Sequence, residues 1–507
     1  MFCRRSPFKI DILAIAFIFL LATGCNAGSN PLTPIPSTST PTPTAGFENS
    51  STFIGPQGEV TPTATAVPIG NLSVFQPNFL SDPDAACFIN HIDWTLTGNP
   101  LANDDNAFSC LDKRGWHVYA PGTFTEPLPA PRWIGQCPDG RIYLDVVLNN
   151  SHKFYRLKGE TLTVLPSLDI SVDSLACGPG SEIWVIYSGG VGHYNGTYWT
   201  VYAAEQYLGT GEFVGLVNSI AMAPDGSVWV ATGSSIATFD GTSWRVFETG
   251  KGFEEKPILY SLDIDSTGNV WVANNHGLMS YDGSQWSTYY EGLPNRFEYY
   301  SKTIRVDAEN RIWMAREYPA AVYLYDPQAK SWVTKISEDA LKVNLIKAMQ
   351  LDRQGRLWFV TDYGLDVYDG SVLTSYHMHT ADLYANTADA LIVLGDGPRL
   401  PALEQKAPGS VHGKVIGPDP AKYTGRQVET CIKAAGIMFY GKTPCGDQAF
   451  HVLSTIQADG NFEFTDVPVG KYYLMIQAPS NSWRGTGLFE VKPGTRTELG
   501  GIELPSN

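Results

Sequence analysis

The sequence predicts an all-β protein, and three observations lead to that fold class. A short pattern of turn, aromatic strand and hairpin recurs along the middle of the chain. Turn-forming residues are plentiful, with 49 glycines and 34 prolines among 507 residues. Only 17% of the residues are charged, whereas 43% are hydrophobic and 12% aromatic. This composition is typical of many short strands with buried faces rather than of long, charged helices.

Residues 1–24 have the features of a signal peptide for export. Three basic residues precede the uninterrupted apolar run Ile12–Ala22, which is too short to span a bilayer stably. The sequence LATGC, which ends at Cys25, resembles the lipobox of bacterial lipoproteins. That resemblance implies cleavage before Cys25 and attachment of a lipid to its thiol. An ordinary cleaved signal peptide with an incidental cysteine is the alternative.

Residues 25–68 are rich in proline and threonine and predict an extended tether, followed by a lead-in over residues 69–106. We therefore expect a lipid-anchored protein of the cell envelope, on the outer face of the cytoplasmic membrane or on another extracytoplasmic membrane face. The net charge of −16 argues against a nucleic-acid partner, because phosphate contacts need basic patches.

Residues 107–400 carry the repeat, whose period is that of a four-stranded β-propeller blade. The aromatic residue of each unit recurs every 41 to 45 residues, at Tyr143, Trp184, Trp229, Trp271, Trp313 and Trp358. Six full repeats are flanked by a half-repeat at Ala107 and another at Asp389. Joining the two halves gives one closing blade and seven blades in all. An eighth blade within residues 70–106 is the alternative.

The repeated residues have structural explanations. Asp-Gly and Asn-Gly pairs supply the positive φ angles of two-residue hairpins, for example at Asp240-Gly241. The tryptophans are expected to pack between blades. The acidic turn residues are expected to bond their own turns rather than calcium, so no metal or other cofactor is predicted. They are Asp225, Asp265, Asp307 and Asp352.

The repeat is similar to that of the two-component-regulator propeller family over about 290 residues, most closely from Ile220 to Tyr376. This resemblance implies an extracytoplasmic recognition domain. The chain departs from the usual arrangement of that family, because no kinase motif and no membrane-spanning run follow the repeats. Similar propellers occur in the virginiamycin B lyase family, so the fold does not exclude an enzyme.

After a linker at residues 401–408 the repeat stops, and a new strand is expected at Val411. For the segment 409–507 a small β-sandwich is implied by a resemblance in its centre. The stretch DGNFEFTDVPVGKYYLMI, from Asp459 to Ile476, resembles the carboxypeptidase-regulatory-like, transthyretin-like domain. The resemblance implies a seven-stranded module that supports or spaces other domains.

Six cysteines remain besides Cys3 and Cys25, and an even number in an exported chain indicates disulfides. Sequence proximity favours Cys87–Cys110, Cys137–Cys177 and Cys431–Cys445, although other connectivities stay open.

The candidate ligand-binding residues lie in loops at one end of the predicted channel. They are Asn274, His276, Arg316, Glu317, Tyr318, Asp362 and Tyr363. His276 with Glu317 could form a base–acid pair, and His377 with His379 could bind a metal, but we expect neither and assign no catalytic residue. Packing within their own loops is the alternative role for all of them.

Three classes of function follow. We favour a recognition or scaffold protein that binds a glycan, a peptide or an envelope protein through the propeller rim. The alternatives are a lyase- or hydrolase-type propeller enzyme and a purely architectural envelope protein.

Overall fold

The computed structural model describes residues 82–90, 106–119, 131–148, 151–158, 161–166, 168, 170–187, 189–209, 215–249, 252–253, 257–293, 300–317, 320–341, 345–417, 419–432, 443–446 and 450–503. The signal peptide, Cys25 and the tether lie outside these residues, so their assignment stays a prediction. Among the described residues, no helix has the length and apolar character needed to cross a membrane.

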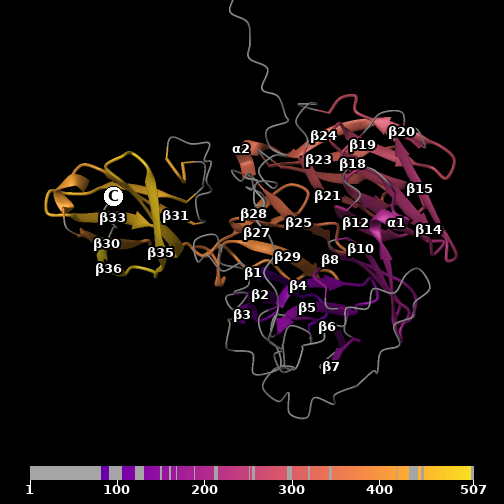
Figure 1. Ribbon diagram of the computed structural model, residues 1–507, viewed down its shortest axis with the longest axis horizontal. Helices are drawn as coiled ribbons and strands as arrows, with labels where there is room; N and C mark the ends of the chain where they lie inside the picture. Colours follow the sequence, from indigo (N-terminus) through magenta and orange to yellow (C-terminus); the bar gives the residue numbers. More distant parts are fainter. Residues whose placement is uncertain are drawn as a thin grey trace, which may run out of the picture. The chain divides into compact units, whose positions relative to one another are not determined.

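The predicted β-propeller is confirmed, and it has seven blades (Figure 1). Six blades follow one another along the chain, each a sheet of consecutive antiparallel strands. They are β4 (Pro131–Gln136), β5 (Ile142–Leu148), β6 (Ser151–Lys158) and β7 (Thr161–Val164); β8 (Val172–Cys177), β9 (Ile183–Tyr187), β10 (Gly190–Tyr194) and β11 (Trp199–Ala203); β12 (Val217–Met222), β13 (Val228–Thr232), β14 (Ile236–Phe239) and β15 (Trp244–Thr249), with the short parallel strand β16 (Gly252–Phe253); β17 (Leu259–Ile264), β18 (Val270–Asn274), β19 (Gly277–Tyr281) and β20 (Trp286–Tyr289); β21 (Tyr300–Val306), β22 (Ile312–Glu317), β23 (Ala321–Asp326) and β24 (Ser331–Ile336); β25 (Ile346–Leu351), β26 (Leu357–Thr361), β27 (Gly364–Tyr368) and β28 (Leu373–Tyr376).

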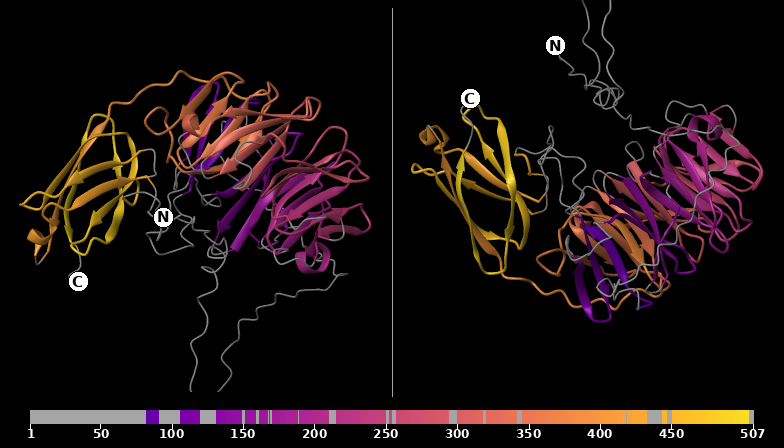
Figure 2. Two further views of the ribbon diagram at one scale, coloured as in Figure 1. Left: turned by 90° about the horizontal axis from the view of Figure 1, so that it is seen from above. Right: turned by 60° about the horizontal axis from the view of Figure 1, so that its bottom comes forward.

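The seventh blade closes the ring with strands from both ends of the propeller sequence. Its order is β29 (Ala388–Val393), β1 (Ala86–Asn90), β2 (Ala107–Asp112) and β3 (Gly115–Tyr119). Figure 2 shows these indigo strands beside the orange ones. The start of the propeller at residue 107 needs correction, because β1 lies within the expected lead-in. Its sequence ACFIN lacks the aromatic repeat signature and is recognised as a blade strand only through its pairing with β29 and β2.

The first strand of each sheet is innermost, and these seven strands contact one another in a closed ring: β29, β4, β8, β12, β17, β21, β25 and back to β29. All of them begin at the same end of the ring, because each four-stranded antiparallel blade returns the chain to the end where it started. We call this end the channel mouth. The loops between the second and third strands of each blade lie at the same end.

The aromatic residue of each repeat packs onto the following blade, which confirms its predicted structural role. Trp184 lies in a cluster with Ile220 and Val228 of the next blade, and Trp358 in a cluster with Phe88 and Leu391 of the closing blade. The six aromatic residues are at most 7% exposed. Stacking of this kind buries both faces of each sheet, which one blade could not do alone.

The acidic turn residues accept hydrogen bonds from their own turns, as expected. The backbone N–H two residues ahead donates to each carboxylate at 2.9 to 3.1 Å. In three blades the turn carboxylate also accepts the indole N–H of the blade's tryptophan, for example Trp358 Nε1 to Asp352 Oδ2 at 2.8 Å. In these three blades the turn therefore fixes the buried ring that follows it.

The C-terminal segment folds into two sheets. One has the order β33 (Asn461–Val467), β30 (Gly409–Ile416) and β36 (Arg496–Glu503); the other has the order β32 (Val452–Thr455), β31 (Gln427–Cys431), β34 (Gly470–Gln477) and β35 (Trp483–Val491). Phe462 and Phe464, on one face of β33, are each 1% exposed in the core. Short helices complete the described chain: α1 (Ala204–Tyr207), α2 (Glu338–Leu341) and the 3₁₀ turn at Pro420–Tyr423.

The three disulfides favoured by sequence proximity are formed. Cys87 and Cys110 face each other on paired strands of the closing blade. Cys137 directly follows β4, the innermost strand of its blade, and Cys177 is the last residue of β8, the innermost strand of the next blade. Their disulfide therefore joins two blades. Cys431 and Cys445 are joined in the sandwich.

Candidate functional site

The channel mouth is lined by residues at β-bulges. In each of the seven innermost strands the register with the second strand shifts within the first few residues, so that an extra residue is accommodated there. Single extra residues are Arg132, Asp173, Asn218, Tyr260 and Lys347. In β29 the shift spans Asp389 and Ala390, and in β21 it spans residues 301–302. Repetition around the ring therefore gathers six described polar or aromatic residues at one opening.

Lys347 links two blades at this mouth. Its Nζ lies 2.7 Å from Asp389 Oδ1 on the closing blade and 3.3 Å from Asp362 Oδ1 in its own blade. Burial disfavours the charged lysine, but Asp389 and Asp362 outweigh that effect and raise its pKa. Lys347 is therefore a fixed positive charge between two carboxylates.

A second group of charges lies between the blades β4–β7 and β8–β11. Asp145 is fully buried on β5, and its carboxylate lies 3.0 Å from His152 Nδ1 on β6. The same carboxylate accepts the backbone N–H of Val172 at 3.2 Å, which ties the next blade to this pair. Near this pair, burial raises the pKa of the Asp173 carboxyl. The negative charge of Asp145 raises this pKa further, whereas the positive charge of Arg132 lowers it.

The sequence-predicted candidates in the blade β17–β20 lie close to this mouth. Asn274 is fully buried at the end of β18, where its Oδ1 accepts the backbone N–H of His276 at 2.7 Å and its Nδ2 donates to Tyr290 Oη at 3.3 Å. The His276 ring lies beside Asn275, with 3.1 Å between its Nε2 and Asn275 Nδ2. These contacts organise the loop in which they lie.

The candidates of the next two blades are also buried. Arg316 and Glu317 end β22 at 4% and 1% exposure, and Arg316 Nη2 lies 2.8 Å from Glu338 Oε2. Asp362 and Tyr363 are 5% and 2% exposed. Tyr318 lies outside the described residues. The structure thus places Asp362 in contact with the mouth through Lys347, and the ligand roles of all seven residues stay predictions.

His377 and His379 follow β28 rather than lying on it. Their rings are parallel with centroids 5.0 Å apart, and His377 Nδ1 donates to the carbonyl oxygen of Tyr363. Burial, His377 and Lys406 together lower the pKa of His379 to about 4. His379 is therefore uncharged near neutral pH.

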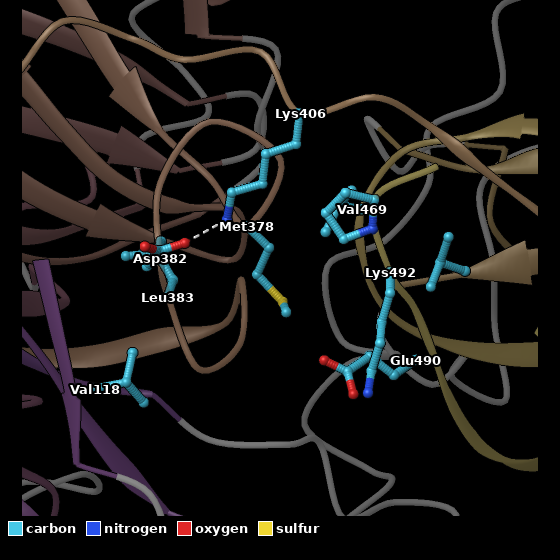
Figure 3. Close-up of a pocket in the computed structure, with 10 residues that line it drawn as sticks. Val118, Met378, Asp382, Leu383, Lys406, Val469, Glu490 and Lys492 are labelled. Atoms are coloured by element: carbon cyan, nitrogen blue, oxygen red, sulfur yellow. Dashed lines mark hydrogen bonds and ion pairs between the residues drawn. The ribbon is translucent and has the colours of Figure 1, made fainter. Parts of the chain in front are cut away.

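A cavity of about 280 Å³ lies elsewhere, lined by Val118, Met378 and Leu383 together with Glu490 and Lys492 (Figure 3). On its wall Lys406 Nζ and Asp382 Oδ1 form an ion pair at 2.8 Å, shown as a dashed line in Figure 3. Because these two charges satisfy each other, this wall offers a ligand mainly apolar side chains. We assign the cavity no ligand.

Sequence reasoning identified the loops of the mouth but missed its bulged residues. Lys347 and Asp389 are single charges within the apolar strands IKAMQL and ADALIV. A charge at the second position of an innermost strand was the available signal, and it recurs as Arg132 and Asp173.

No family model and no curated protein matches the chain. Among solved structures the chain is similar to PorZ, a surface component of the type-IX secretion system of Porphyromonas gingivalis, with 14% identity, 76% of this chain and 63% of PorZ covered, and a TM-score of 0.41. It is also similar to virginiamycin B lyase from Staphylococcus aureus, with 12% identity and a TM-score of 0.41. The match covers 52% of this chain and 92% of the lyase. A third similar structure is the extracellular domain of a protein assigned to a one-component system of B. thetaiotaomicron. It has 10% identity, covers 81% of this chain and 69% of its own, and has a TM-score of 0.36. The chain thus spans less than two thirds of the length of PorZ.

Proposed function

We propose that this chain is an exported, lipid-anchored envelope protein that binds a ligand at the mouth of its propeller channel. The observation that carries the proposal is the ring of bulged residues, because it brings charges of both signs, an amide and a phenol to one opening. Polar groups that several strands bring to one opening are candidates for ligand contact. A glycan, a peptide and another envelope protein are the ligand classes considered.

Export and anchoring are supported by the signal-like segment that ends before Cys25 and by the three disulfides, which persist in oxidising compartments. Labelling of cells with radioactive palmitate tests the anchor. We expect the label on the wild-type protein and none on a Cys25→Ala variant. Equal labelling of both proteins would refute the anchor.

Binding is tested with the full-length protein, purified in detergent, on glycan and peptide arrays. The double variant Arg132→Ala with Asn218→Ala removes two exposed side chains of the mouth. Arg353→Ala is the matched control, because this exposed arginine lies in the turn after β25, at the opposite end of the ring. Saturable binding that the double variant loses and the control keeps supports the proposal. No binding to either array favours the architectural alternative.

The Asp145–His152 pair supports an enzyme as a second candidate. A buried carboxylate that holds an imidazole Nδ1 orients the ring as a general base requires. The bound array ligand would be analysed by mass spectrometry after incubation with wild-type protein and with His152→Ala. Conversion by the wild type alone would support an enzyme, whereas recovery of unchanged ligand from both would exclude turnover of that ligand.

A further inference from the structure

The ring order divides the six described bulge residues of the channel mouth into two arcs. The charged arc comes from four consecutive innermost strands, β25, β29, β4 and β8. It consists of Lys347, Asp389, Arg132 and Asp173, so that positive and negative charges alternate around it. The uncharged arc comes from the next two strands, β12 and β17, which contribute Asn218 and Tyr260. A ligand that covers the mouth meets both arcs.

The uncharged arc also exposes two aliphatic side chains. Leu216 directly precedes β12 and is 60% exposed, and Ile258 directly precedes β17 and is 40% exposed. Single exposed apolar residues are common on proteins, but these two begin adjacent blades at the same opening. They form an apolar counterpart to the charges across the mouth.

Backbone hydrogen bonds hold this apolar arc in place. The carbonyl oxygen of Leu216 accepts the Gly233 N–H at 2.8 Å, and the carbonyl oxygen of Gly233 accepts the Leu259 N–H of the next blade at 3.2 Å. The Ile258 N–H donates to Asn275 Oδ1 at 2.8 Å, and its carbonyl oxygen accepts the Asn275 N–H at 3.0 Å. Because the backbone is fixed, a partner can bury the two side chains without first ordering a loop.

These features distinguish between ligand classes. A polyanionic ligand does not suit an arc in which each cationic group has a carboxylate neighbour. A neutral sugar would stack on an exposed aromatic ring, and Tyr260, the aromatic ring among the six described bulge residues, is only 9% exposed. An extended peptide offers apolar side chains together with charged and main-chain polar groups, and so matches both arcs at once.

We propose that the occupant of the mouth is an extended peptide segment, with an apolar side chain on Leu216 and Ile258 and its charged or main-chain groups on the charged arc. This inference rests on the proposed binding function and specifies its ligand. The alternating charges favour a peptide that carries groups of both signs near its apolar residue.

The test uses the full-length protein in detergent with a peptide library and a glycan array. The double variant Leu216→Ser with Ile258→Ser removes the apolar arc. Val372→Ser is its matched control, because Val372 is 56% exposed and lies in the β27–β28 turn at the opposite end of the ring. We expect the double variant to lose affinity for selected peptides about tenfold or more, and the control to lose none. For peptides with an acidic group, we expect Arg132→Ala to lower the affinity of the protein about tenfold and Arg353→Ala to leave the affinity unchanged.

The outcomes separate the two proposals. Saturable glycan binding without peptide binding would leave the binding function standing and overturn the peptide inference. Peptide binding that the double serine variant retains would overturn it as well, because the apolar arc would then contribute nothing. Failure to bind any probe would contradict the binding function itself. Thermal melting of each variant confirms that a lost affinity does not reflect unfolding.

Discussion

Asn90 ties the two ends of the propeller sequence together. It is fully buried at the end of β1, and its Nδ2 donates to the carbonyl oxygens of Ala385 at 2.6 Å and Thr387 at 3.1 Å. Its Oδ1 accepts the hydroxyl of Ser109 on β2. One amide therefore joins β1 and β2 to the segment that enters β29, and an Asn90→Ala variant should weaken ring closure.

The expected magnitude follows from these contacts. The substitution removes three hydrogen bonds, each of which contributes about 1 kcal/mol net, and it leaves the buried carbonyl of Ala385 without this donor. A buried polar group that loses its partner costs about 1 to 3 kcal/mol. Because some of these groups keep other contacts, we expect Asn90→Ala to lower the free energy of unfolding by about 3 kcal/mol.

Urea unfolding followed by tryptophan fluorescence measures this effect. With a slope of about 3 kcal/mol per molar urea for a domain of this size, the midpoint should fall by about 1 M. Asn195→Ala is the control, because Asn195 lies in an exposed hairpin turn and accepts only local backbone N–H groups in the described contacts. If the two variants unfold within about 0.2 M of each other, Asn90 does not secure the ring and the reasoning is wrong.

Three further predictions concern the scaffold. Asp352→Ala should lower the free energy of unfolding by about 2 to 4 kcal/mol, because it removes a buried carboxylate that accepts hydrogen bonds from an indole and a guanidinium. The control Asp225→Ala, in an exposed turn, should lower it by about 1 kcal/mol. Equal urea midpoints for the two variants would contradict this prediction. Replacing Cys137 and Cys177 by serine opens a loop with a sequence separation of 40 and should cost about 4 kcal/mol, which an unchanged melting temperature would refute. Burial and cationic neighbours lower the pKa of His379 from 6.5 to about 4, so the unfolded chain binds a proton in this range that the folded chain does not. The free energy of unfolding should therefore fall as the pH drops from 6.5 to 4, and His379→Gln should remove this part of the pH profile.

The sequence predicted the fold well where the same residue type makes the same local contact in each repeat. The turn carboxylates bond their own backbone, and the tryptophans fill the space between blades, so both recur at a fixed spacing. The strand at residues 86–90 was missed because it pairs with a segment that is distant in the sequence. Its position depends on pairing with β29, about 300 residues away, and no nearby residue records that partner.

The candidate site was less predictable for the same reason. Loop residues such as Asn274 and Asp362 stand out in the sequence as polar residues between strands, and the structure buries both near the mouth. Arg132 and Lys347 lie within strands, where a polar residue is expected to face solvent on the outside of a sheet. Only the register shift between two strands places them at the opening.

The bulges also separate stability from recognition. On either side of each bulge the strand resumes its ladder, and the apolar residues that follow, such as Ile134 and Met349, fill the core. The extra residue itself is outside the ladder register, so strand pairing does not determine its type, which differs from blade to blade. It is aspartate, arginine, asparagine, tyrosine or lysine in the six blades compared. The aromatic position of the second strand is tryptophan in four of these blades and tyrosine in another. Substitutions at exposed bulges such as Arg132 should therefore change the free energy of unfolding by only about 0.5 kcal/mol, so that a loss of binding in those variants reports on the mouth and not on the fold.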